Sequence, residues 1–227
     1  MARLWVTDVA LTTLLVSLVI YVFILHPLAQ LASVKLLVLV FFSLILISGA
    51  ITASRNRIFR SVVLSWSLLT FTFLWAAHLF PNGVLVLADL CLSLVFLVLL
   101  NVLILSQVFR EGPTTSHRIM GAIAAYLLLG LIWSLIYQAI AVQIPNAFKG
   151  LEPFAGSDPD LLRMRFQYFS FTVLTTVGFG DIVPVDPIAQ MAAVLEATTG
   201  QLFVVILIAR LVTLQINAAQ SQARKGD

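Results

Sequence analysis

The chain has 227 residues, of which 61% are hydrophobic and 10% are charged, and its mean hydropathy is +1.07. Roughly a quarter of the residues of a soluble domain are charged, so we expect lipid to surround most of this chain. The 13 basic residues lie at the ends of apolar runs and form no basic face, which argues against nucleic acid as a partner. Cys91 is the single cysteine, so an intrachain disulfide is excluded. The three histidines are isolated from one another and form no metal-ligand cluster. We find no enzyme motif in the sequence.

Six apolar segments have a length suited to crossing a bilayer, which takes about 20 residues. In chain order they are Val9–Leu25, Leu36–Ile51, Val62–Phe80, Val84–Val108, Met120–Val142 and Ile188–Leu214. A signal peptide is the alternative for the first, since Arg3 precedes it, although its length and the five later segments favour a membrane span. With the N-terminus inside, nine Lys and Arg residues fall on the inner side and four on the outer side, so we expect both termini in the cytoplasm.

The first four segments make up a region of residues 1–112, which ends at the helix-breaking pair Gly112-Pro113. The fourth segment carries Asp89 and contains no Lys or Arg. His78, at the outer end of the third segment, is placed to reach Asp89. Two interpretations of this pair stay open: a proton sensor or a hydrogen-bonded strut.

Residues 113–219 make up a second region, in which the last two segments flank an outer stretch too long for a simple turn. Asp158-Pro159 suits the N-cap and first position of a helix. This helix is expected to run from Leu161 to Thr175, about four turns, which is too short to cross a bilayer. Non-helical backbone follows it, the pattern of a re-entrant loop, which is tolerated at membrane depth only where protein or water surrounds it.

The six residues from Thr176 to Asp181 read Thr-Val-Gly-Phe-Gly-Asp and resemble the filter of the K⁺ channel family, whose consensus is Thr-Val-Gly-Tyr-Gly-Asp. The match runs without gaps from Phe166 through Pro184 into the last segment. The resemblance implies an all-α membrane protein with six transmembrane helices, a re-entrant pore helix and a selectivity filter, assembled as a homotetramer like bacterial six-transmembrane K⁺ channels. It also implies that K⁺, the permeant ion, binds at Thr176, Val177, Gly178 and Phe179, with Gly180 completing the filter.

Dehydration is the physical reason for these residue types, because K⁺ must exchange its water shell for rings of carbonyl oxygens from four chains. Gly178 and Gly180 lack a Cβ atom and can adopt positive φ, which lets successive carbonyls point the same way. The short helix before the filter is expected to aim its carbonyl end at the cavity. That end is partly negative and favours a cation.

Two residues depart from the family pattern. Phe179 replaces the usual Tyr, and Phe169 stands where many relatives carry Trp, so aromatic packing is expected instead of a hydrogen-bonded cuff. Two consequences stay open: the filter inactivates readily, or Phe packs equally well. The residues expected to support the filter are Thr172, Thr175, Phe169, Asp181 and Glu196.

The last segment carries Glu196 and Gly200, about one helical turn apart. An intramembrane carboxylate is a functional candidate, either as a brace behind the filter or as a side chain satisfied near Thr172 or Thr175. Gly200 matches the gating hinge of relatives, and close helix packing is its alternative. By the same alignment, the residues expected to face the water-filled cavity and inner gate are Gln201, Val204, Ile208 and Val212.

The first four segments resemble a voltage-sensor scaffold without gating charges, because a sensor needs several Lys or Arg along its fourth helix. Residues 220–227 are expected to be a short cytoplasmic tail, without a soluble ligand-binding domain. The sequence therefore predicts a voltage-independent K⁺-selective channel in a plasma membrane of bacterial type, with K⁺ and membrane lipids as partners and no cofactor. The alternatives are a weakly selective cation channel, a silent or regulatory channel subunit, and a K⁺ transporter.

Overall fold

The computed structural model describes residues 2–25, 28, 37–45, 57–80, 83–109, 116–151 and 159–226, and most of them are helical. The helices are α1 (Ala2–Val19), which continues as the π-helix η1 (Ile20–Leu25), α3 (Arg57–Leu79), α4 (Gly83–Val108), α5 (Ser116–Gln143), α6 (Pro159–Leu174) and α7 (Pro187–Gly226). Residues 37–45 are also helical. Two short strands, β1 (Phe148–Lys149) and β2 (Val183–Pro184), form an antiparallel pair.

Three of the described helices are long and apolar enough to cross a membrane: Gly83–Val108, Arg118–Gln143 and Pro187–Thr213. They coincide with the fourth, fifth and sixth predicted spans. The first and third predicted spans contain shorter apolar stretches, Leu11–Leu25 and Ser61–Ala77. The second extends beyond the described residues 37–45. The chain is therefore a membrane protein, and the count of six spans stays a prediction.

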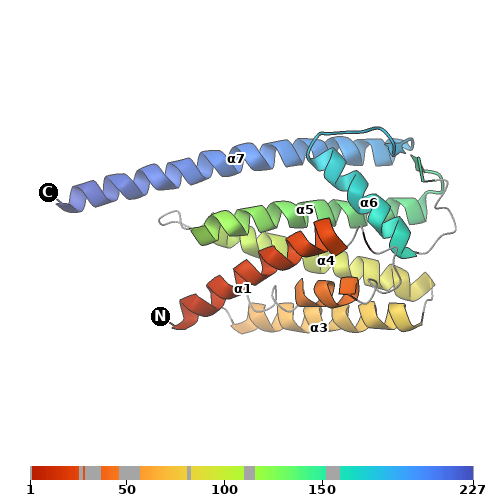
Figure 1. The fold of residues 1–227 in the computed structure, drawn as a ribbon, viewed down its shortest axis with the longest axis horizontal. Helices are drawn as coiled ribbons and strands as arrows, with labels where there is room; N and C mark the ends of the chain where they lie inside the picture. Colours follow the sequence, from red (N-terminus) through yellow and green to blue (C-terminus); the bar gives the residue numbers. More distant parts are fainter. Residues whose placement is uncertain are drawn as a thin grey trace.

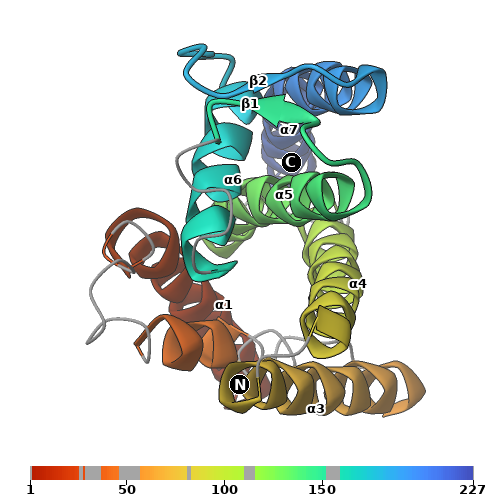
Figure 2. The same cartoon turned by 90° about the vertical axis from the view of Figure 1, so that its right-hand side faces the viewer.

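Helix α5 is the central element of the fold (Figures 1 and 2). Helices α1 and α4 pack on α5, and α3 packs on α4. Helices α6 and α7 also contact α5 and contact each other. The chain thus places its first helices beside its own α5, the arrangement that the short connection after α4 favours.

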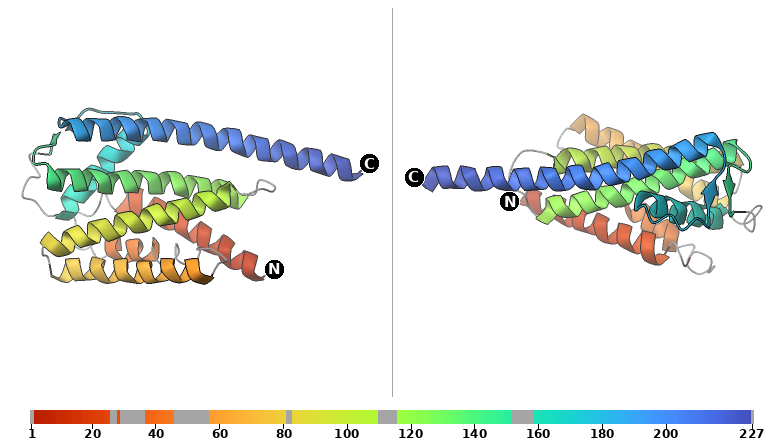
Figure 3. Two further views of the ribbon diagram at one scale, coloured as in Figure 1. Left: turned by 180° about the vertical axis from the view of Figure 1, so that it is seen from behind. Right: turned by 90° about the horizontal axis from the view of Figure 1, so that it is seen from above.

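Helix α6 is a 16-residue helix that begins at Pro159, where the sequence predicts a helix start. It crosses obliquely in front of α5 and α7 in Figure 1. Helix α7 runs alongside α5 and then continues beyond it (Figure 3). Residues expected to form the tail therefore extend the last helix as far as Gly226.

Two groups of buried apolar side chains hold these helices together. The larger group lies among α1, α4 and α5 and includes Leu14, Phe96 and Leu128. The smaller group surrounds the C-terminal half of α5 and the middle of α6. Its buried rings belong to Trp133, Tyr137, Phe148, Phe166 and Phe169. The aromatic group fixes α6 against α5 through large, rigid contacts.

Helix α7 leaves most of its apolar surface uncovered by its own chain. In the apolar part of α5 that is long enough to cross a membrane, 67% of the residues are buried, whereas the corresponding share in α7 is 11%. Val205, Ile208 and Val212 are more than half exposed. A helix this apolar must be covered by lipid or by another chain.

The β1–β2 pair ties the stretch after α5 to the stretch before α7. Its register aligns Phe148 with Pro184. Gly150, which follows β1, has φ of +87°, and a Cβ atom there would lie 1.9 Å from the carbonyl oxygen of Asp181. Only glycine allows this approach, so the end of the Thr176–Asp181 run is held against the chain that leaves α5.

Gly130 provides a test of the packing between α5 and α6. A Cβ atom at Gly130 would lie 2.7 Å from Cζ of Phe171. Overpacking of this kind costs about 1–3 kcal/mol, so Gly130→Ala is expected to lower the free energy of unfolding in detergent by that amount. Gly83→Ala is the matched control, because nothing lies within 4 Å of its added methyl group. Equal stability of the two variants would contradict the packing.

Candidate functional site

The filter segment, defined here as Thr175–Asp181, leaves the end of α6 and is exposed on the surface of the single chain. Its backbone amides point back to α6. The amide of Thr176 donates to the carbonyl of Val173 at 2.9 Å, and those of Val177 and Gly178 both donate to the carbonyl of Thr172, at 2.9 and 3.1 Å. The amide donors of the first part of the filter segment, up to Gly178, are therefore satisfied by α6.

Every second residue of the filter segment has positive φ: 59° at Thr176, 55° at Gly178 and 79° at Gly180. Glycine adopts this conformation without steric cost, as the sequence predicts for the last two. Thr176 is β-branched, and positive φ is rare for such a residue and costs of order 1–3 kcal/mol. The bonds to α6 hold Thr176 in this strained conformation.

The hydroxyl groups of the two support threonines, Thr172 and Thr175, both bond to backbone carbonyls of α6. The hydroxyl of Thr175 donates to the carbonyl of Phe171 at 2.6 Å, and that of Thr172 donates to the carbonyl of Phe169 at 2.8 Å. The main contribution of Thr172 to the filter segment is its carbonyl oxygen, which accepts the two amide bonds described above.

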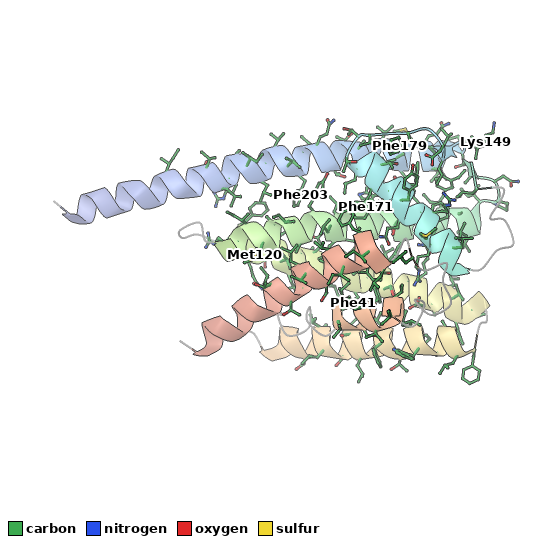
Figure 4. The ribbon with its side chains drawn as sticks, viewed as in Figure 1. Phe41, Met120, Lys149, Phe171, Phe179 and Phe203 are labelled. Atoms are coloured by element: carbon green, nitrogen blue, oxygen red, sulfur yellow. The ribbon has the colours of Figure 1, made fainter. Side chains whose placement is uncertain are left out.

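Phe179 and Phe169 lie in different surroundings within the chain. The ring of Phe179 stacks on Tyr168, with centroids 6.3 Å apart and an interplanar angle of 3°. Phe169 instead packs edge-on against Tyr137 and Phe148, at 4.9 and 5.6 Å. Figure 4 shows Phe179 beside the upper end of α6.

Tyr168 also connects α6 to the outer end of the filter segment. Its pKa is raised, first by partial burial and second by a side-chain hydrogen bond with Asp181. The protonated phenol therefore donates to Asp181 while its ring stacks on Phe179. Sequence reasoning missed this residue, although an aromatic with a polar tip one position before Phe169 was a usable signal.

Glu196 is fully buried between α5, α6 and α7. The hydroxyl of Tyr137 donates to its Oε2 atom, and Oγ of Ser170 lies 2.5 Å from its Oε1 atom. The same Ser170 Oγ donates to the carbonyl of Gly130 at 2.7 Å. The carboxyl group thus contacts α6 one to two turns before the filter segment, and sequence reasoning identified neither of its hydroxyl partners.

Gly200 packs directly against the carbonyl end of α6. A Cβ atom at Gly200 would lie 2.5 Å from the carbonyl oxygen of Leu174 and 2.9 Å from its Cδ1 atom. The hydroxyl of Tyr126 donates to the same carbonyl at 3.3 Å. Close packing therefore accounts for this glycine, and α7 is continuously helical through it.

The residues expected to face the cavity lie after Gly200 on α7. All four are exposed in the single chain: Gln201, Val204, Ile208 and Val212. In the membrane-length part of α7, only 11% of the residues are buried by the rest of the described chain.

Asp89 of α4 is buried and forms an ion pair with α6. Its Oδ2 atom accepts from Nη2 of Arg163 at 2.9 Å, and Ser93 donates to Oδ1 at 3.3 Å. The side chain of His78 lies outside the described part of the chain. Sequence reasoning missed Arg163 as the partner of Asp89; the usable signal was that an ionised acid in a membrane helix is usually paired with a basic residue.

A groove of about 610 Å³ opens between η1, α5, α6 and the filter segment. Its lining includes Phe23, Tyr126, Phe171, Thr175, Val177 and Phe179. Most of these side chains are apolar, so the groove presents an uncovered apolar surface next to the filter segment. The described residues contain no group of three or more His, Cys, Asp or Glu side chains that could hold a metal ion.

Comparison with known proteins agrees with this geometry. Residues 125–216 match the family described as "Ion channel". The matched residues include α6, the filter segment and most of α5 and α7, so this part of the chain is similar to an ion channel domain.

Among curated proteins, the chain is similar to the Two-pore potassium channel 4 of Arabidopsis thaliana, with 32% identity over 103 residues. The aligned part covers 44% of this chain and 35% of the plant protein, so the match spans about a third of the relative's length. No solved structure matches the chain. The resemblance to the K⁺ channel family indicated by the Thr-Val-Gly-Phe-Gly-Asp run is confirmed by these two matches.

Exchange of the two charges tests the Asp89–Arg163 pair. Asp89→Asn leaves Arg163 without its counter-ion and is expected to lower the free energy of unfolding by about 1–3 kcal/mol. The double variant Asp89→Arg with Arg163→Asp is expected to recover part of that loss. Lys149→Gln, at an exposed position, is the control. The pairing would be contradicted if the double variant lost more stability than the single variants Asp89→Arg and Arg163→Asp lose together.

Proposed function

We propose that four copies of this chain form a K⁺-selective channel that conducts K⁺ passively through a shared filter at Thr176, Val177, Gly178, Phe179 and Gly180. The observation that supports this most is the direction of the filter amides. Three successive amides donate to the carbonyls of Thr172 and Val173 in α6. Their bonding leaves the filter carbonyls available for a dehydrated cation.

The helix dipole of α6 favours a cation at the same place. Helix α6 ends at Leu174, immediately before the filter segment, so its negative end lies at the start of that segment. Gly200 allows α7 to approach this end closely. The face of α7 beyond Gly200, with Gln201, Val204, Ile208 and Val212, would then line the water-filled cavity.

Assembly as a homotetramer follows from what the single chain leaves exposed. One chain supplies one quarter of each carbonyl ring. The single chain leaves three surfaces uncovered: one face of α7, the filter segment, and the apolar groove between η1, α5, α6 and the filter segment. Copies of the chain packed around the filter axis would cover these surfaces, with membrane lipids around the outside.

The region of residues 1–112 is proposed to anchor the pore region of residues 113–219 without sensing voltage. Helix α4 has no Lys or Arg between Val84 and Val108. The acid that it carries, Asp89, is bonded to α6. A charge held in this pair cannot move through the membrane field, which provides about 2.3 kcal/mol per charge per 100 mV.

The distribution of Lys and Arg supports a plasma-membrane orientation with both described ends of the chain on the cytoplasmic side. The end of α7, up to Gly226, would then lie in the cytoplasm. No cofactor is proposed, and K⁺ is the permeant ion.

Flux measurements on purified protein in liposomes test the proposal. We expect K⁺ efflux through the wild-type protein and little Na⁺ flux under matched gradients. Equal K⁺ and Na⁺ flux would favour a weakly selective cation channel, which is the main alternative. Absence of flux from protein that is tetrameric in detergent would favour a silent or regulatory subunit.

The bond between Tyr168 and Asp181 gives a second test. Tyr168→Phe removes the hydroxyl group and keeps the ring that stacks on Phe179. We expect K⁺ current in planar bilayers to decline severalfold faster after opening, because loss of one hydrogen bond to a charged group costs about 1.5–3 kcal/mol. An unchanged time course would show that ring stacking alone holds the outer end of the filter segment.

A further inference from the structure

The oxygen atoms around Glu196 form more close pairs than the hydroxyl protons of Tyr137 and Ser170 can bridge by hydrogen bonds. Three pairs of oxygens are within hydrogen-bond distance: Tyr137 with Oε2 of Glu196, Ser170 with Oε1 of Glu196, and Ser170 with the carbonyl of Gly130. Each pair needs one proton between its oxygens, because two acceptor oxygens this close repel each other. Three protons are therefore required.

The neighbours of Glu196 supply only two of these protons. Tyr137 and Ser170 each carry one hydroxyl proton, and the carbonyl of Gly130 carries none. The count does not depend on the direction in which each hydroxyl points. The third proton must come from the carboxyl group itself.

We infer that Glu196 is a neutral carboxylic acid whose proton completes a hydrogen-bonded chain from Tyr137 through Glu196 and Ser170 to the carbonyl of Gly130. In this chain Tyr137 donates to Oε2, the protonated Oε1 donates to Ser170, and Ser170 donates to Gly130. The chain starts and ends on α5 and passes through α7 and α6. It therefore locks the three helices that position the filter segment, and Glu196 acts as a positioning residue.

The surroundings of the carboxyl group agree with a neutral acid. The polar groups that face it in the described part of the chain are Tyr137 and Tyr126 of α5 and Ser170 of α6. None of these three is a cation. A fully buried carboxylate without a cationic partner is costly in a low-dielectric interior, whereas a protonated carboxyl group is satisfied by hydrogen bonds.

A neutral Glu196 differs from a charged brace in its response to substitution. Gln has the same shape, and its amide can accept from Tyr137 and donate to Ser170, so Glu196→Gln preserves all three contacts. A carboxylate can only accept, so an ionised Glu196 leaves one of the three contacts without a proton. The role of this hydrogen-bonded chain in conduction rests on the proposed channel function. The inference that Glu196 is protonated does not depend on that function.

Infrared spectroscopy of the purified full chain in lipid tests the proton directly. The wild-type minus Glu196→Gln difference spectrum at neutral pH is expected to contain the carbonyl-stretch band of a protonated carboxyl group. Asp89→Asn, which alters a paired carboxylate, is the matched control and is expected to show a carboxylate band. A carboxylate band in the Glu196→Gln difference spectrum would overturn the inference.

The positioning role is tested by hydrogen exchange and ion flux on the same variants. Glu196→Gln is expected to keep both the K⁺ flux and the hydrogen-exchange protection of α6. In alkaline buffer, α6 is expected to lose protection in the wild type and to keep it in Glu196→Gln. Tyr137→Phe removes one contact and is expected to speed α6 exchange by about fivefold or more, the effect of one buried hydrogen bond. In one outcome, the wild-type protein conducts no K⁺ while its spectrum still contains the protonated carboxyl band and Glu196→Gln still keeps the exchange protection of α6. That result would reject the proposed channel function and support the hydrogen-bonded chain. Loss of α6 protection in Glu196→Gln would reject the chain.

Discussion

The structure depends on one constraint: the polar groups of non-helical backbone at membrane depth must be bonded to protein, water or an ion. In the filter segment that requirement is met by α6, whose Thr172 and Val173 carbonyls accept the amides of Thr176, Val177 and Gly178. Because the amides are used in this way, the carbonyls of the same residues are the groups left for an ion. The position and rigidity of α6 therefore decide the geometry of the whole candidate site.

Each neighbouring element contacts α6 by a different interaction. Helix α4 holds its first half through the Asp89–Arg163 pair. Helix α5 contacts the middle of α6 through aromatic rings and through the close approach of Gly130 to Phe171. Helix α7 contacts α6 through Glu196 and Gly200. Tyr168 then connects the helix to the outer end of the filter segment. Several of these contacts are polar and buried, where a missing partner costs more than in water, so α6 is fixed in one arrangement.

The region of residues 1–112 gains a physical role from the same contacts. Its helix α4 carries no Lys or Arg between Val84 and Val108, the residue types that would respond to a membrane field. Its buried acid is used instead to bind α6, and its apolar helices surround α5 with a packed core. We propose that this region stabilises the pore region in lipid and that α4, which lacks these basic residues, does not respond to voltage.

The sequence by itself determined the features that depend on composition and local conformation. Apolar length predicts the three longest membrane helices, Pro159 marks the start of α6, and Gly178 and Gly180 adopt the positive φ expected of them. These features are local, because hydropathy, helix initiation and the missing Cβ atom act within a few residues.

Only the tertiary structure decided which distant side chains meet. Arg163 counts in the sequence as an outer-loop charge, yet it pairs with Asp89 from 74 positions away. Phe169 packs with Tyr137 and Phe148, while the stacking partner of Phe179 is Tyr168. Glu196 stands out in the sequence as an intramembrane acid, but its partners on α5 and α6 are set by how the three helices cross. Side-chain contacts between helices depend on rotation and crossing angle, which hydropathy and spacing along one chain do not specify.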